Sequence, residues 1–202
     1  MPAAPRPYRQ VARAAATVEA RRRIVRTFLG MLGETPLDQI TLDDVAARAN
    51  STRQTLIRYF GGKDGLMQAV GAQMAEEVHA RRSVAPGASL EEHMAGLVRD
   101  YEEVGDVIVQ LLAQEARLPS LRTFLDYGRT DHRAWITQIF ARWLAGLPAD
   151  ERARRIDQLY AATDVNTWKL FRRDFGHSAD ATAAMIADLT RRVAGAPLKG
   201  EK

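Results

Sequence analysis

Cysteine is absent from this chain of 202 residues. Its absence excludes disulfide bonds, thiolate metal ligands and a cysteine nucleophile. Long apolar runs are absent too. None approaches the roughly 20 residues of a membrane-spanning helix, and the first residues lack the apolar core of a signal peptide. We therefore expect no membrane contact and a cytoplasmic protein.

Catalytic motifs are equally scarce. The sequence contains no glycine-rich phosphate loop, no G-x-S-x-G nucleophile elbow and no H-E-x-x-H zinc motif. The four histidines are far apart in the chain, at His79, His93, His132 and His177. The sequence therefore indicates no enzyme, no metal site and no cofactor.

Helical periodicity dominates what is present. Apolar residues recur at helical spacing from residue 17 onward, and no segment shows the alternation of a strand. We predict an all-α fold of about nine helices in two domains. The predicted helices include 17–33, 66–82, one that begins at the capping box of Ser89 and Glu92, 119–147, 149–174 and 178–194.

The segment 40–66 has the pattern of two short helices joined by a tight turn. The first helix has its apolar residues on one face, namely Leu42, Val45, Ala46 and Ala49. Thr41 and Asp44 have the spacing of a capping box at its start. Asn50 suits the left-handed backbone of a turn, and Ser51 is the expected cap of the second helix. The helix-turn-helix motif is therefore placed at 41–60.

The second of these helices has a free polar face. Leu56 and Phe60 anchor its apolar side, which leaves arginine, glutamine and threonine side chains unoccupied. A short helix of this kind, braced by a second one, has the geometry that enters the major groove of DNA. The same pattern also occurs in helix pairs that only pack against each other.

Starting from the helix before it, this segment resembles the N-terminal DNA-binding domain of the TetR (tetracycline repressor) family of transcriptional regulators. The residues that carry the resemblance are Ile40-Thr41-Leu42, Val45-Ala46, Ala49-Asn50-Ser51, Thr55-Leu56, Tyr59-Phe60, Lys63 and Leu66. The chain departs from the family at Asn50, Ser51 and Ile57, where the family often has glycine, an apolar residue and tyrosine. Gly61-Gly62 also replaces a more usual proline- or serine-containing link. Because that tyrosine commonly contacts phosphate, we assign no such role to Ile57.

The resemblance and the side-chain chemistry together predict the DNA contacts. The predicted contact residues are Thr41, Thr52, Arg53, Gln54, Thr55, Arg58, Tyr59 and Lys63. The four residues 52–55 are expected at or near base edges, where Arg53 favours guanine and Gln54 favours adenine. Thr41, Tyr59 and Lys63 are expected at phosphates, and Arg58 suits either.

The distribution of charge agrees with this prediction. Residues 1–65 hold 11 Lys/Arg and 6 Asp/Glu, whereas the remaining residues hold 18 and 19. The positive excess therefore belongs to the segment that would approach phosphates. Residues 1–16 are rich in proline, alanine and arginine and are predicted to be a flexible basic tail. Such an arm can enter a minor groove, although tails of this composition are commonly just disordered.

The domain boundaries follow from these segments. We predict a three-helix DNA-binding domain at 17–78, a helical ligand-binding and dimerisation domain at 79–195, and a tail at 196–202. The resemblance implies a small-molecule effector that enters among the middle helices. The candidate pocket residues are Tyr101, His132, Trp135, Phe140, Asn166 and Trp168. Ordinary core packing is the alternative for the aromatic ones, and it is the more common role of aromatic residues at helical spacing.

The last two predicted helices carry apolar and small residues on one side. They are suited to pair with a second copy as a four-helix bundle, which is how the family dimerises, and packing within one chain is the alternative. The prediction is a homodimeric transcriptional regulator, a repressor that binds a pseudo-palindromic operator in double-stranded DNA and is released by a small molecule. It would be cytoplasmic and associated with the nucleoid when bound to DNA. The alternative interpretation is a helical small-molecule-binding protein with a vestigial DNA-binding domain, and a more distant one is an enzyme in the second domain.

Overall fold

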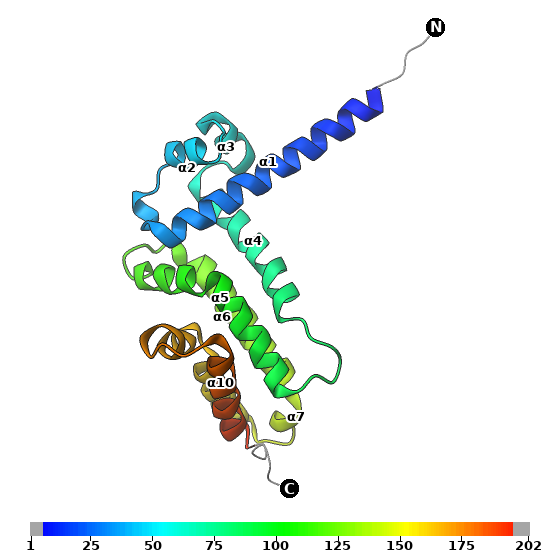
Figure 1. Cartoon of the computed structure of the whole chain (residues 1–202), viewed down its shortest axis with the longest axis vertical. Helices are drawn as coiled ribbons and strands as arrows, with labels where there is room; N and C mark the ends of the chain where they lie inside the picture. Colours follow the sequence, from blue (N-terminus) through cyan, green and yellow to red (C-terminus); the bar gives the residue numbers. More distant parts are fainter. Residues whose placement is uncertain (1–5, 196–202) are drawn as a thin grey trace. The chain divides into compact units, whose positions relative to one another are not determined.

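The computed structural model describes the backbone of residues 6–195 and the side chains of residues 13–195. All regular elements in this part of the chain are helical, which confirms the predicted all-α fold (Figure 1). In chain order they are α1 (Arg6–Glu34), η1 (Leu37–Gln39), α2 (Leu42–Arg48), α3 (Arg53–Phe60), α4 (Lys63–Arg82), α5 (Leu90–Gln114), α6 (Leu121–Ile139), α7 (Ala141–Leu144), α8 (Ala149–Thr163), α9 (Val165–Lys169), the π-helical η2 (Leu170–Asp174) and α10 (Ala179–Ala194). None of the helices between residues 6 and 195 is long and apolar enough to cross a membrane.

The chain divides into two compact units, residues 1–73 and residues 74–202. The division falls inside α4, so one continuous helix belongs to both units. The boundary expected from the sequence, after residue 78, lies in the same helix.

The first helix begins earlier than predicted. α1 starts at Arg6, so residues 6–16 of the predicted flexible tail are helical. Alanine and arginine are strong helix formers, and Pro7 stands in the first turn, where proline is tolerated. Composition alone suggested a tail because this stretch has few side chains to bury. Residues 1–5 of that tail, and the predicted tail at 196–202, lie outside the described residues.

The first unit has a small core built from α1, α2, α3 and the start of α4. Its fully or almost fully buried side chains include Ile24, Phe28, Leu32, Ile40, Val45, Leu56, Leu66 and Val70. Among the described side chains of α1, residues 13–34, the buried ones recur at helical spacing and lie in the C-terminal half of the helix. This half of α1 therefore braces the two short helices that follow.

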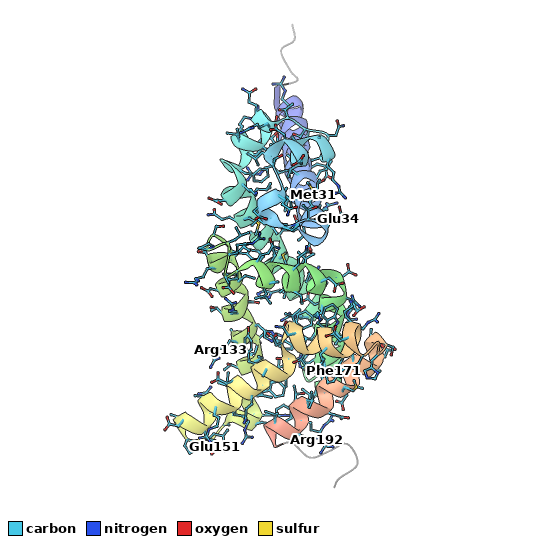
Figure 2. The ribbon with its side chains drawn as sticks, turned by 90° about the vertical axis from the view of Figure 1, so that its left-hand side faces the viewer. Met31, Glu34, Arg133, Glu151, Phe171 and Arg192 are labelled. Carbon is cyan, nitrogen blue, oxygen red and sulfur yellow. The ribbon has the colours of Figure 1, made fainter. Side chains whose placement is uncertain are left out.

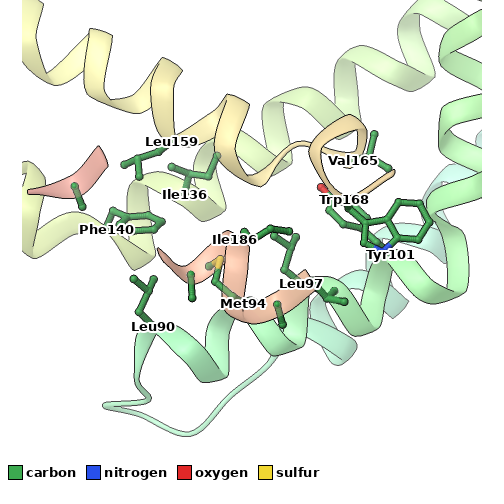
Figure 3. Packing of buried hydrophobic residues seen from close by; sticks show 14 of the residues in the cluster. Leu90, Met94, Leu97, Tyr101, Ile136, Phe140, Leu159, Val165, Trp168 and Ile186 are labelled. Carbon is green, nitrogen blue, oxygen red and sulfur yellow. The ribbon is translucent and has the colours of Figure 1, made fainter. Parts of the chain in front are cut away.

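The second unit is organised around α5. This helix packs against α9 and α10, while α8 packs against α6 and α10. Side chains from all of these helices meet in one apolar cluster (Figure 3). Its fully buried members include Met94, Leu97, Ile136, Phe140, Leu159, Trp168 and Ile186. Each buried side chain of this size contributes about 1.5–3 kcal/mol to folding.

Two helices that the sequence predicts as continuous are interrupted. The predicted helix 119–147 ends at Ile139, and a separate short helix follows Phe140. The predicted helix 149–174 breaks after Thr163, whose carbonyl accepts a hydrogen bond from the Tyr101 hydroxyl at 3.0 Å. Asp164 then caps α9 by accepting from the Asn166 amide at 2.9 Å. A long-range hydrogen bond thus replaces the local one that would have continued the helix.

Trp168 fits over Gly105 of α5. A Cβ atom at position 105 would lie 2.5 Å from the indole ring, which is closer than real contacts allow. The indole Nε1–H donates to Glu102 Oε1 at 2.9 Å, and the Arg173 guanidinium lies 4.6 Å from the ring centroid. The absence of a side chain at Gly105 is therefore required for α9 to approach α5.

Substitution of this glycine tests the close approach. Gly105→Ala should lower the free energy of unfolding by about 1–3 kcal/mol, because overpacking forces the indole ring or the helix to shift. Urea unfolding followed by Trp fluorescence measures the change. Gly128→Ala on α6 is the matched control, since a Cβ there meets open space and alanine favours the helix. Equal effects of the two substitutions would contradict the proposed close approach.

Candidate functional site

The turn between α2 and α3 has a defined backbone. Asn50 adopts a positive φ of 48°, as its position in the sequence suggested. The Ser51 amide donates to the Ala46 carbonyl at 2.8 Å, which closes the end of α2. The cap of α3 is Thr52 and not Ser51, because the Thr52 hydroxyl accepts from the Thr55 amide at 3.2 Å. The prediction for Ser51 was wrong by one residue, since the turn after Asn50 uses one more residue than expected.

The start of α2 is held by the predicted capping box. The Thr41 hydroxyl accepts from the Asp44 amide at 3.1 Å, and the Asp44 carboxylate accepts from the Thr41 amide at 3.0 Å. The Thr41 hydroxyl also donates to Asp44, and these bonds lower the pKa of the Asp44 carboxyl. Thr41 is exposed at the N-terminal end of the helix, where backbone amides and the helix dipole favour an anion.

α3 presents a largely polar free face. Leu56 is its buried anchor, and its exposed residues are Thr52, Arg53, Gln54, Ile57 and Arg58, with Thr55 and Tyr59 partly exposed. Gln54, Ile57 and Arg58 have i, i+3 and i+4 spacing and therefore share one face. Ile57 is 45% exposed, so an apolar side chain stands on this otherwise polar face. No DNA contact was predicted for Ile57, although the spacing along the helix already placed it beside Gln54.

Two arginines of the motif are held in surface ion pairs. Arg53 Nη1 lies 3.0 Å from Asp43 Oδ2, and both side chains are more than half exposed. Arg48 forms a two-pronged pair with Glu34, at 2.6 and 2.8 Å, which lowers the pKa of the Glu34 carboxyl. Exposed pairs of this kind contribute little to stability. Arg53 can therefore leave Asp43 at small cost when a better acceptor is present.

Lys63 has a structural contact in addition to its predicted DNA contact. Its Nζ donates to the Ile40 carbonyl at 2.6 Å, which ties the first turn of α4 to the residue preceding Thr41. Partial burial lowers the pKa of the Lys63 ammonium, opposed by the nearby carboxylates of Asp38 and Asp64. An ammonium group has three donors, so two remain for other acceptors.

Tyr59 lies against two guanidinium groups at the contact between α1 and α3. Arg58 is 5.0 Å and Arg21 is 5.8 Å from the centroid of its ring, and Arg21 also lies 5.1 Å from the ring of Phe60. Arg23 of α1 donates to the Ala49 carbonyl at 3.0 Å and so caps the end of α2. Arg21 thus brings a positive charge to a predicted phosphate contact, which spacing along the chain could not reveal.

The predicted pocket residues divide into two groups. Tyr101, His132, Phe140 and Trp168 are buried in the second unit, and Trp135 is partly buried beside the His132 ring at 5.6 Å. Asn166, by contrast, is exposed, and its amide donates to Asp164 at the start of α9. The structure therefore does not bring Asn166 together with the aromatic residues.

A buried polar network fixes the end of α4. Asp100 is fully buried in α5, and its two carboxylate oxygens accept from Arg81 Nε at 2.8 Å and Arg82 Nε at 2.9 Å. The Arg82 guanidinium lies between the rings of Tyr101 and Trp135, at 5.4 and 5.2 Å from their centroids. Stacking and ion pairing together compensate the cost of burying this charge.

His132 extends the network to α8. Arg82 Nη1 lies 3.1 Å from His132 Nδ1, and because arginine can only donate, Nδ1 must accept. The proton of the neutral ring is then on Nε2, which donates to the Thr163 hydroxyl at 3.0 Å, and that hydroxyl donates to the Leu159 carbonyl at 2.8 Å. Burial, with a smaller contribution from Arg82, lowers the pKa of His132 to about 3. His132 is therefore a neutral residue that connects Arg82 of α4 with Thr163 of α8.

A shallow groove lies elsewhere on the second unit, between α6 and the start of α8. Its volume is about 630 Å³, and its lining residues are Thr130, Arg133, Ala134, Thr137, Gln138, Ala141 and Arg152. Arg133 points outward from α6 in Figure 2 and is paired with Asp157 at 2.7 Å. None of the predicted pocket residues lines this groove.

Comparison with known proteins identifies the first unit. Residues 25–70 match the family described as "Bacterial regulatory proteins, tetR family". This match confirms the resemblance carried by residues 40–66. A comparison with curated protein sequences found no match.

Two solved structures share the fold. The tetR-family transcriptional regulator from Streptomyces coelicolor is 17% identical, with a TM-score of 0.65 over 91% of each chain. A transcriptional regulator from Rhodococcus sp. Rha1 is also 17% identical, with a TM-score of 0.66 over 86% of this chain and 95% of that one. The shared fold thus extends over both units.

The low pKa of His132 predicts a pH dependence of stability. The folded chain keeps this ring neutral down to about pH 3, whereas the unfolded chain protonates it near its ordinary pKa of about 6.5. Between these values the unfolded state binds the extra proton, so the contribution of His132 is complete above about pH 6.5 and is lost as pH falls. The slope is at most about 1.4 kcal/mol per pH unit.

His132→Gln should flatten this part of the stability profile, because glutamine does not titrate and can still accept from Arg82. Urea unfolding at several values between about pH 4 and pH 7 measures the slope. His177→Asn, at a partly exposed position, is the control. The same slope in both variants would show that His132 is not the residue responsible.

Proposed function

We propose that this chain, which has the TetR-family fold and carries the family's DNA-binding domain at residues 25–70, is a dimeric transcriptional repressor released by a small molecule. The single observation that carries the proposal is the match over the helix-turn-helix, together with the exposed polar face of α3 within it. A repressor needs only to cover a promoter, and no further domain is required for that. Its place of action would be the cytoplasm, on the nucleoid.

α3 supplies the base contacts in this proposal. Arg53 exchanges Asp43 for guanine, which offers two acceptors to its planar group, and Gln54 forms the corresponding pair with adenine. Ile57 lies on the same face as Gln54 and suits the methyl group of thymine. Arg58 extends from the same face toward a base or a phosphate. The Thr52 and Thr55 hydroxyls lie 3.0 Å apart at the start of α3. In the proposed complex they reach the edge of an adjacent base or its sugar.

The phosphate contacts flank this face. Thr41 offers the N-terminal end of α2, and Tyr59 offers a hydroxyl beside Arg21 and Arg58. Lys63 uses the two donors left free by its bond to the Ile40 carbonyl. These contacts position α3 and carry no sequence information of their own.

Pairing of two chains would use the outward side of α10. Ala181, Ala184, Met185, Asp188 and Leu189 form a stripe of partly or fully exposed residues on this helix. Leu170 and Phe175, before α10, are also exposed large apolar side chains. Small residues permit close approach of a second α10, and the apolar ones would be buried by it. Twofold pairing supports two α3 helices reading two half-sites of one operator.

The effector would act on the buried aromatic group of the second unit. Tyr101, Trp135 and Trp168 contact one another or the stacked Arg82, so a ligand that enters here must separate packed side chains. It changes DNA affinity only if it binds one conformation more tightly than the other.

Base reading by Arg53 is tested by substitution. On duplexes enriched by the wild-type chain from a random pool, Arg53→Ala should reduce discrimination at one base pair per half-site by about 1–3 kcal/mol. Gel shifts on single-base variants of that duplex measure the preference. Arg48→Ala is the matched control, because Arg48 is equally exposed and also ion-paired but lies on α2. Unchanged preference in Arg53→Ala would refute the assignment, and failure of the wild type to enrich any duplex would favour a small-molecule-binding protein.

Dimerisation through α10 has its own test. Ala184→Glu should yield monomers at concentrations where the wild type is dimeric, because two like charges would be buried at the twofold axis. Sedimentation velocity measures the mass. Ala113→Glu on the exposed side of α5 is the control and should remain dimeric. A dimeric Ala184→Glu variant would place the interface elsewhere.

A further inference from the structure

The positive charge of the first unit is concentrated in one helix. Residues 6–26 hold seven arginines and one glutamate, whereas residues 27–65 hold four Lys/Arg and five Asp/Glu. Within the helix-turn-helix at 41–60, three arginines stand against two aspartates, so its positive excess is only one charge. Attraction of a polyanion must come mainly from α1.

Most of the positively charged side chains at 27–65 already have a partner within the protein. Of the four cations at 27–65, Arg48 is paired with Glu34 and Arg53 with Asp43, and Lys63 is bonded to a backbone carbonyl. The fourth, Arg58, stacks on the Tyr59 ring and has no ion pair among the described residues. In α1, Arg13, Arg22 and Arg26 are exposed and form no ion pair with any residue that the structure describes. These arginines are therefore available to an external partner.

One face of α1 changes from apolar to basic toward the N-terminus of the helix. Phe28 and Ile24 lie on this face and are fully buried in the core of the unit. Toward the N-terminus, at helical spacing, it continues with Arg21, Thr17 and Arg13, all of which are exposed. The sequence carries the same spacing on to Arg9 and Arg6, whose side chains lie outside the described part. The side that holds α2 and α3 thus becomes basic where these helices end.

The N-terminal part of α1 has no packing partner among the described residues. Every side chain at 13–19 is exposed, and Figure 1 shows the dark-blue end of α1 continuing past α2 and α3. A helix that buries nothing is only marginally stable. Residues 6–20 hold only three large apolar residues, Tyr8, Val11 and Val18, which is fewer than a membrane-surface helix of this length needs to bury. Charge and composition both favour a nucleic acid as its partner.

We propose that α1 on the N-terminal side of Arg21 is a second DNA-binding element. It is a basic helical arm that contacts the phosphate backbone of the duplex beyond the base pairs read by α3. The arm neutralises phosphates without reading bases, and DNA in turn stabilises its helix. The proposal rests on the proposed DNA-binding function and adds to it the source of most of the electrostatic affinity.

The test replaces the arm's charge and keeps its helix. In Arg6→Gln/Arg9→Gln/Arg13→Gln, glutamine retains helix propensity close to that of arginine. The plot of log affinity against log salt should become shallower by about 0.9 for each phosphate that the variant no longer neutralises, hence by about 2 to 3. Affinity should fall by the same factor on operator and random duplexes, so base preference stays unchanged. Fluorescence anisotropy with labelled duplexes at several KCl concentrations measures both quantities.

A charge-matched control separates the arm from net charge. Arg99→Gln/Arg152→Gln/Arg154→Gln removes three exposed arginines from the second unit and should leave the salt slope at its wild-type value. An arm variant with the wild-type slope, or with the same reduction as this control, would overturn the proposal. So would an arm variant that loses affinity for anionic lipid vesicles while its DNA affinity is unchanged. A wild-type chain that binds no duplex at all would instead refute the proposed function.

Discussion

Asp100 is completely buried, and its carboxylate accepts hydrogen bonds from Arg81 and Arg82 at the end of α4. A buried carboxylate must be paired, and so must a buried guanidinium, so neither α4 nor α5 can move here without exposing a charge to an apolar surrounding. His132 transmits the same constraint to α6 and to Thr163 at the end of α8. One network of hydrogen bonds thus connects α4, α5, α6 and α8.

The N-terminal end of α4 lies in the first unit and is held by a different contact. There the Lys63 ammonium donates to the Ile40 carbonyl, directly before the capping box of α2. α4 therefore makes a polar contact at each end. At its start, Lys63 bonds to the residue before the helix-turn-helix, and at its end Arg81 and Arg82 bond to Asp100. The aromatic rings of Tyr101 and Trp135 lie against Arg82 at the C-terminal end of this helix.

In the proposed DNA-binding function, base reading and electrostatic attraction belong to different helices of the first unit. α3 carries the face that we propose reads bases, and its Arg53 is already paired with Asp43. α1 carries three exposed arginines, Arg13, Arg22 and Arg26, that form no ion pair with any described residue. Discrimination between bases requires directional hydrogen bonds, whereas attraction to phosphates requires only net charge, so different helices can supply the two.

Local chemistry was sufficient for the features that the sequence predicted correctly. Thr41 with Asp44, Ser89 with Glu92, and the positive φ of Asn50 each depend on residues within four positions. The misplaced cap at Ser51 shows the limit of this approach, because a turn can use one more residue without changing the pattern.

The sequence by itself determined the all-α class, the helix-turn-helix and its resemblance to a family, because periodicity and capping act over a few residues. Tertiary structure decided the break after Thr163, which Tyr101 causes from 62 residues away, and the burial of His132 as a neutral relay. It also decided which arginines remain unpaired. These outcomes depend on which distant side chains meet, and spacing along the chain carries no information about that.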